Sequence, residues 1–272
     1  MIIVTGMHRS GTSAAAHLLA ELGMDLGPTS QLLAGDQWNA RGYWENRRVL
    51  LCNDRLVLGG GVAYPDRYYQ IPRNQRPPTM RLRMSLLWAR SILHDNPDAI
   101  RRRARALEPT MRSITQRFHG ALVKDPRFCL TLPEWRRRDA VERALVVLRG
   151  REACAASLAR RNRLPRRFGR KLWERHYRRL LQGLAGLTVV VVSFHRLLDP
   201  TTANDELDRL AAFAARPIDP ATRRRLCQNV VDPALTTQPA GNELETAADP
   251  TSIRLAQLHA AYPSPRPFTP LQ

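Results

Sequence analysis

Four short apolar segments, each rich in β-branched or aliphatic residues, are distributed along the chain. They cover residues 2–5, 121–123, 144–148 and 188–192. Segments that are apolar on both faces are typical of strands buried within a parallel sheet. The pattern therefore predicts four buried, parallel β-strands.

Segments with the apolar spacing of helices alternate with these strands. They cover residues 12–22, 80–93, 100–118, 152–161 and 172–184. This alternation predicts an α/β fold, in which a doubly wound parallel sheet is flanked by helices and joined by right-handed crossovers.

The first and last parts of this pattern are irregular. Residues 6–120 separate the first two predicted strands, far more than a crossover needs, so we predict a large helical insertion at about residues 25–118. Proline is frequent from residue 233 onward, and only residues 252–261 keep a helical pattern there. We therefore expect one domain at 1–232 and a Pro-rich C-terminal tail at 233–272, with its last residues extended and poorly specified.

Charge is distributed unevenly. The chain has 43 Lys and Arg residues against 24 Asp and Glu, a formal net charge of +19, and more than half of the basic residues fall within 101–180. A cationic surface is expected there, suited to phosphate, sulfate or an anionic surface such as a membrane periphery. A non-enzymatic nucleic-acid binder is an alternative on charge alone, but no recognition motif is present, and we expect no specific nucleic-acid partner.

Other composition features narrow the cellular setting. The 4 cysteines form no C-x-x-C pair and the 7 histidines are scattered singly, so we expect a reducing compartment and no metal site. No apolar run approaches the ~18 residues of a membrane helix. The glycine-containing segment follows residue 1 almost directly, so we expect no signal peptide and a cytoplasmic location.

The strongest local motif is the glycine loop after the first predicted strand. Its residues are Gly6, Met7, His8, Arg9, Ser10, Gly11, Thr12 and Ser13. A strand, a glycine turn and a helix start together direct backbone N–H groups and the helix dipole at one point, which suits a phosphate or sulfate. The spacing of Gly6 and Gly11 matches a P-loop, but Thr12 stands where a nucleotide triphosphatase has lysine, and the cation is Arg9 instead.

A second anion-binding candidate lies at the third predicted strand. Arg149 follows the end of that strand, and Ser157 comes eight residues later within the next predicted helix. Because ligands bind outside the carboxyl ends of parallel strands, Arg149 is expected to share one sheet edge with the glycine loop.

Together these motifs resemble those of the sulfotransferases that use 3′-phosphoadenosine 5′-phosphosulfate, in particular bacterial, carbohydrate-sulfotransferase-like members with a P-loop-like fold. Segments 42–46, 124–128 and 191–200 are also similar, and the resemblance covers about residues 2–215. It implies a sulfuryl donor bound without a metal, with His8, Arg9, Ser10, Gly11, Thr12 and Ser13 holding the 5′-phosphosulfate. It also implies that Arg149 and Ser157 hold the 3′-phosphate.

The resemblance implies sulfuryl transfer to a hydroxyl acceptor, namely a carbohydrate, a glycolipid or a small natural product. Arg9 would act only electrostatically, because a guanidinium does not give up its proton. Glu45, in an aromatic segment, is the first candidate for the base that takes the acceptor proton, and related enzymes use Glu or His from this part of the fold. Asp125 is the rival base, and Lys124 beside it is a candidate contact for sulfate or acceptor.

Two other functions remain open from the sequence. A P-loop kinase of small molecules would need a lysine at position 12 and an acidic Mg²⁺ ligand at a strand end, for which Asp125 is a loose match. The basic nucleic-acid binder named above would leave the glycine loop without a purpose. The acceptor's identity and the oligomeric state are left open by the sequence.

Overall fold

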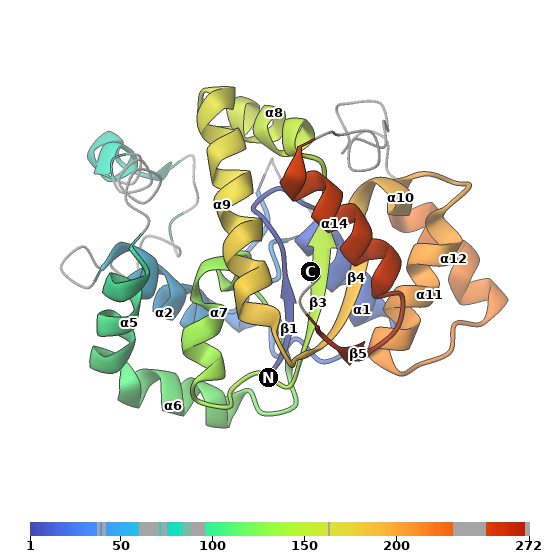
Figure 1. Cartoon of the computed structure of the whole chain (residues 1–272), viewed down its shortest axis with the longest axis horizontal. Coiled ribbons are helices and arrows are strands. Elements are labelled where there is room, and N and C mark those ends of the chain that lie inside the picture. The colour runs from blue at the N-terminus through green and yellow to red at the C-terminus, as the bar shows by residue number, and fades with distance from the viewer. Residues whose placement is uncertain are drawn as a thin grey trace.

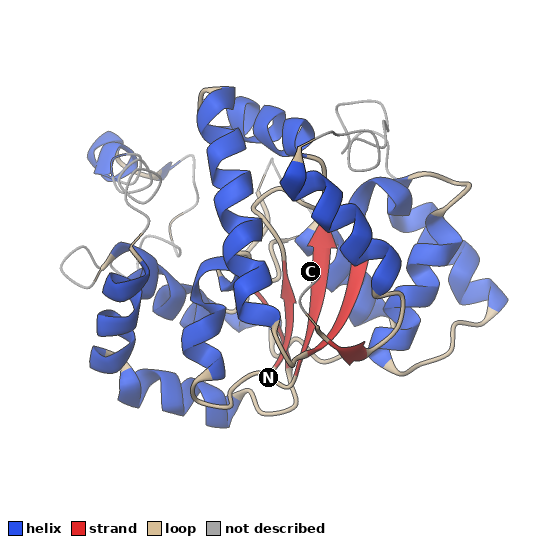
Figure 2. Cartoon of the chain, in the orientation of Figure 1, coloured by secondary structure: helices blue, strands red, loops and turns tan. Residues whose placement is uncertain are grey.

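The computed structural model describes residues 1–36, 39, 42–59, 71, 75–83, 86, 96–162, 164–230 and 249–269. Its centre is a five-stranded sheet in the order β2-β1-β3-β4-β5. Figure 2 shows the strands surrounded by helices. The strands are β1 (Ile2–Thr5), β2 (Leu122–Lys124), β3 (Arg143–Leu148), β4 (Thr188–Ser193) and β5 (Arg266–Pro267). The first four are parallel and β5 runs antiparallel to β4, so the predicted α/β class is confirmed, with a sheet that is mostly parallel.

Helices cover both faces of the sheet because successive strand residues point to opposite sides. On one face, Val4, Leu145 and Val190 pack with α1 (Thr12–Glu21), α11 (Ala203–Ala214) and α12 (Pro220–Val230). On the other face, Ile3, Val146 and Val191 pack with α7 (Phe128–Arg136), α9 (Arg166–Leu184) and α14 (Pro250–Ala261). Figure 1 shows α9 and α14 crossing one face of the strands.

Two further helices follow strands at their carboxyl ends. Helix α8 (Arg151–Asn162) follows β3, and the short helix α10 (Phe194–Leu198) follows β4. In the parallel register Leu148 lies opposite Ser193, so β3 and β4 end side by side. The start of α8 and the start of α10 therefore meet at the edge of the sheet that also carries the loop after β1.

The segment between β1 and β2 contains the expected helical insertion. Within its described residues lie a short 3-10 helix (Thr29–Gln31), α2 (Arg47–Leu58), α5 (Pro97–Ala106) and α6 (Glu108–Arg117). The single helix predicted over 100–118 is divided at Leu107, because Pro109 lacks an amide hydrogen and is tolerated only in the first turn of a helix. Most of the helix predicted over 80–93 lies outside the described residues.

The described part of the expected tail, 249–269, contains α14, which confirms the helix predicted at 252–261, but the residues after this helix pack onto the domain instead of being poorly specified. Leu255 and Leu258 of α14 are fully buried in the core. The amide of Phe268 donates to the Leu187 carbonyl at 2.7 Å, beside the edge strand β5. Proline suits an edge strand, where one side of the backbone needs no partner, so a Pro-rich segment can still close a sheet.

Candidate anion-binding and active site

The loop between β1 and α1 is a tight turn pressed against the ends of β3 and β4. Gly6 and Gly11 have φ values of 154° and 94°, and Arg9 also has a positive φ of 71°. A side chain at Gly6 would lie 2.3 Å from the Val147 carbonyl oxygen, and one at Gly11 would lie 2.1 Å from the Phe194 ring. Both glycines are therefore required by close approach as well as by conformation.

Arg9 and Arg149, predicted to face one ligand, lie next to each other. The Arg149 guanidinium donates from Nη1 to the Arg9 carbonyl oxygen at 3.0 Å, and Arg9 donates from Nε to Ser157 Oγ at 2.9 Å. The Arg149 guanidinium also lies 5.1 Å from the centre of the Phe194 ring. Three of the residues predicted to hold the donor thus share one edge of the sheet.

Arg161 is a third cation at this edge and was missed in the sequence analysis. It stands four residues after Ser157 on α8, so helical periodicity places both side chains on one face of the helix. This spacing could have identified Arg161 from the sequence. Arg161 donates from Nη2 to the Tyr43 hydroxyl at 2.5 Å, and its guanidinium lies 4.9 Å from the Tyr43 ring centre. Burial lowers the pKa of Arg9 to about 10, and the charges of Arg161 and Arg149 act in the same direction.

This edge also carries unused hydrogen-bonding capacity. Arg149 Nε, Ser193 Oγ and His195 Nε2 are buried and have no hydrogen-bond partner among the described residues. Burial lowers the pKa of His195 to about 4, with a smaller effect from Arg149, so its imidazole is neutral at pH 7. Since buried polar groups are normally paired, this cluster fits an incoming polar, anionic ligand.

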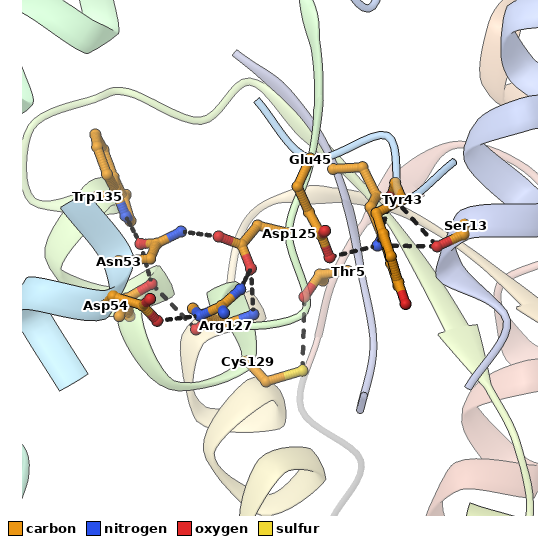
Figure 3. A network of polar contacts seen from close by, with 12 residues as sticks. Thr5, Ser13, Tyr43, Glu45, Asn53, Asp54, Asp125, Arg127, Cys129 and Trp135 are labelled. Atoms are coloured by element: carbon orange, nitrogen blue, oxygen red, sulfur yellow. Dashed lines mark hydrogen bonds and ion pairs between the residues drawn. The ribbon is translucent and has the colours of Figure 1, made fainter. Parts of the chain in front are cut away.

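Lys124, at the end of β2, joins the loop to the segment that contains Glu45. Its buried amine donates to Glu45 Oε1 at 2.7 Å, to Ser13 Oγ at 3.1 Å and to the Tyr43 carbonyl at 3.0 Å. Figure 3 shows Glu45, Tyr43 and Ser13 close to one another, and all three accept hydrogen bonds from the Lys124 amine. Burial lowers the pKa of Lys124, while the Glu45 carboxylate opposes this shift. Glu45 is thus held in an ion pair within reach of the glycine loop.

Asp125, the other predicted base, is enclosed in a separate network. Its Oδ1 accepts from the Arg127 amide at 2.9 Å and from Arg127 Nη1 at 3.0 Å, and its Oδ2 accepts from Asn53 Nδ2 at 2.9 Å. Arg127 also pairs with Asp54, and Trp135 donates to the Asn53 side chain (Figure 3). With a fully buried side chain and both oxygens engaged, Asp125 has a structural environment rather than that of a base facing a substrate.

The remaining predicted loop residues differ in their surroundings. Ser10 and Thr12 are buried, and Ser13 contacts Lys124. His8 points elsewhere, with its ring edge-on to that of His176 at a centroid distance of 5.6 Å. His8 therefore has side-chain neighbours that differ from those of Arg9, although the two residues are adjacent in sequence.

No group of three or more His, Cys, Asp or Glu side chains within the described ranges is arranged to hold a metal ion. Within the same ranges, no helix combines the length and apolar character needed to cross a bilayer. A scan against protein-family models found no match, and neither did searches of curated proteins and of solved structures. Function is therefore inferred from the motifs and from the geometry of this site.

Proposed function

We propose that this protein is a cytoplasmic sulfotransferase of P-loop-like fold, which moves a sulfuryl group from 3′-phosphoadenosine 5′-phosphosulfate to a hydroxyl acceptor. The observation that carries the proposal is the adjacency of Arg9, Arg149 and Ser157. Two hydrogen bonds of 2.9 Å and 3.0 Å link these residues at one sheet edge. One small ligand with two anionic ends can therefore contact both the loop and the exit of β3.

The residues at this edge fit such a donor. The loop amides, Thr12 and Ser13 would hold the phosphosulfate end, and Arg149 with Ser157 would hold the 3′-phosphate. A bound anion would supply the missing partner of Arg149 Nε and offset the mutual repulsion that, with burial, lowers the pKa of Arg9. No metal is needed for this binding, because the cations are supplied by the protein.

In the transfer step, a bond forms between the acceptor oxygen and sulfur while the bond between sulfur and the 5′-phosphate oxygen breaks. The electron pair of the broken bond leaves on that oxygen, giving 3′-phosphoadenosine 5′-phosphate, and the acceptor proton passes to a base. We assign this base to Glu45, which Lys124 orients through a 2.7 Å hydrogen bond. Arg9 stabilises the charge that develops on the leaving phosphate.

The two competing functions fit this site less well. A kinase would use Asp125 to bind Mg²⁺, but Arg127 and Asn53 already engage both carboxylate oxygens. A nucleic-acid binder would not require the buried, unpartnered Arg149 Nε or the Glu45–Lys124 pair. Both functions remain outcomes of the following test.

The test is thermal stabilisation of the purified protein by 3′-phosphoadenosine 5′-phosphate without metal, compared with Mg²⁺-ATP and with a short DNA duplex. A ligand that binds the native state raises the melting temperature, so we expect a rise with the first compound alone. Arg149→Ala should abolish most of that rise, while Arg102→Ala, at an exposed position on α5, should retain it. Stabilisation by Mg²⁺-ATP or DNA but not by the phosphoadenosine compound would contradict the proposal.

A further inference from the structure

Tyr43 lies where the segment that carries Glu45, residues 42–46, meets helix α8. Its side chain is buried, and its ring packs against Arg161, whose guanidinium carbon lies 4.9 Å from the ring centre. The Tyr43 hydroxyl accepts a hydrogen bond from Arg161 Nη2 at 2.5 Å and donates to Asp36 Oδ1 at 2.7 Å. Arg161 therefore holds both the ring and the hydroxyl of Tyr43.

The backbone of Tyr43 belongs to the network that holds Glu45. The Tyr43 carbonyl oxygen accepts from Lys124 Nζ at 3.0 Å and from Ser13 Oγ at 3.3 Å. An ammonium group has three protons, and the described residues offer Lys124 three acceptors. They are the Tyr43 carbonyl, Ser13 Oγ and Glu45 Oε1. The position of the Tyr43 carbonyl therefore helps to set the direction in which Lys124 donates to Glu45.

The backbone between Tyr43 and Glu45 is strained. A single residue, Trp44, separates them, and it has a φ of 61°. This left-handed conformation is unfavourable for a bulky residue, so contacts on both sides must hold it there. On one side are the contacts of Tyr43, and on the other the Leu33 amide donates to the Glu45 carbonyl oxygen at 2.8 Å. Loss of the Tyr43 contacts would let Trp44 relax and would displace Glu45.

Helix α8 relates this network to the proposed donor site. Ser157, which accepts from Arg9 Nε at 2.9 Å, lies about one helical turn before Arg161 on the same face of α8. Because the backbone hydrogen bonds of a helix fix the geometry of each turn, the contact with Tyr43 stays at a set separation from the proposed 3′-phosphate contact. The span from Ser157 to Arg161 thus ties the segment of the proposed base to the donor site.

We propose, on the basis of the sulfotransferase function above, that Arg161 is a positioning residue, which holds Tyr43 so that Glu45 meets the acceptor hydroxyl beside the donor. Arg161 acts through Tyr43 and not on the reacting atoms. A guanidinium can stack on the ring and donate to the hydroxyl at the same time, whereas the ammonium of a lysine is a compact point charge without a planar face. Lysine at this position would therefore keep the charge near the donor but lose the grip on Tyr43.

The experiment uses Arg161→Lys, which keeps the positive charge, and Tyr43→Phe, which keeps the ring but removes the hydroxyl. Transfer from the ³⁵S-labelled donor is measured with 2-naphthol and methyl β-glucoside as probe acceptors. Each variant should lower kcat by about tenfold or more, because a displaced base costs rate, while KM for the donor stays within about twofold. Arg160→Lys, at the adjacent and exposed position of α8, is the matched control and should keep the wild-type kcat.

A second measurement distinguishes positioning of the base from a general effect on the fold. If Arg161 acts through Glu45, Arg161→Lys should cause no additional loss of kcat in the Glu45→Gln background. A merely structural contribution would add its own loss to that of Glu45→Gln. An additive loss, a wild-type kcat in Arg161→Lys, or a rise in KM for the donor with kcat unchanged overturns the inference.

Hydrogen exchange gives a readout that needs no acceptor. The amides of residues 42–46 should exchange faster in Arg161→Lys than in Arg160→Lys, because the segment has lost one of its anchors. Equal exchange overturns the inference even if 3′-phosphoadenosine 5′-phosphate stabilises the wild type. Failure of the proposed function is seen in the wild type instead, as absent stabilisation by that compound together with absent transfer. Tyr43→Phe takes the place of Arg161→Lys if the latter fails to fold, as judged by its thermal melt.

Discussion

Two clusters of buried charge lie near the carboxyl edge of the sheet and differ in how their charges are balanced. In the first, Arg127 sits between the carboxylates of Asp125 and Asp54. In the second, Arg9, Arg149 and Arg161 lie close together, and burial with their mutual repulsion lowers the pKa of Arg9 to about 10. A balanced cluster is complete without a ligand, whereas a cluster of one sign that includes Arg149 Nε, which has no hydrogen-bond partner among the described residues, fits the anion proposed above.

The largest expected effect comes from disrupting the balanced cluster. Asp125→Ala leaves the buried Arg127 guanidinium with one carboxylate instead of two and removes the acceptor for Asn53. Loss of one partner from a buried ion pair costs about 3–5 kcal/mol, so we expect the free energy of unfolding in urea to fall by about that amount.

Asp98→Ala, at an exposed position in the first turn of α5, is the control and should change the free energy of unfolding far less. If Asp125→Ala were as stable as Asp98→Ala but lacked transfer activity, Asp125 would belong to the catalytic cluster and the contrast drawn above would be wrong.

The Glu45–Lys124 pair gives a second test of this comparison, since Lys124 directly precedes Asp125 in the chain and contacts Ser13 of the glycine loop. Glu45→Gln keeps the size of the side chain but removes its ability to accept a proton, so we expect sulfuryl transfer to fall by about a hundredfold or more. The melting-temperature rise with 3′-phosphoadenosine 5′-phosphate should persist, because the contacts proposed for the donor are made by the glycine loop, Arg149 and Ser157 and not by Glu45. Initial rates with the labelled donor and the thermal melt measure the two effects separately. Unchanged rates in Glu45→Gln would move the base to another residue.

A smaller effect concerns His195, which lies beside Arg149. Because burial lowers its pKa to about 4, the folded protein binds fewer protons than the unfolded chain as the pH falls below the usual histidine value of about 6.5. Stability is therefore retained above pH ~6.5 and lost as the pH falls toward 4, by at most about 1.4 kcal/mol per pH unit for this one group. This is measured by urea unfolding of the wild type and of His195→Gln at pH 7, 6 and 5. The free energy of unfolding should fall less in the variant as the pH is lowered.

His119→Gln serves as the control for that measurement, because His119 is exposed. Its stability should depend on pH as the wild type does. Parallel pH profiles for the wild type and His195→Gln would show that His195 does not carry the acid sensitivity.

Much of the fold and part of the site could be predicted because they depend on local patterns. The four apolar segments became β1 to β4, each beginning within one residue of its predicted position. The adjacency of Arg9 and Arg149 was predictable as well, because parallel strands end at the same edge of a sheet. Arg161 could have been found from its spacing to Ser157 on one helix face.

Other features depend on contacts between residues far apart in sequence. Nothing near Asp125 indicates that Asn53, which lies on α2, occupies one of its oxygens. The pairing of β5 with β4 was equally hidden, because a two-residue edge strand containing Pro267 has no periodicity to detect. His8 and His176 provide a further example, because their rings meet although the two residues are far apart in the chain.

The sequence alone determined the order of strands along the chain, the glycine loop and the presence of an arginine at the end of β3, because each follows from short-range spacing and backbone sterics. Only the tertiary structure decided which buried charges pair with opposite charges and which lie beside charges of the same sign. That distinction depends on the distances between side chains brought together by folding. Coulombic and desolvation energies vary steeply with those distances, and sequence separation carries little information about them.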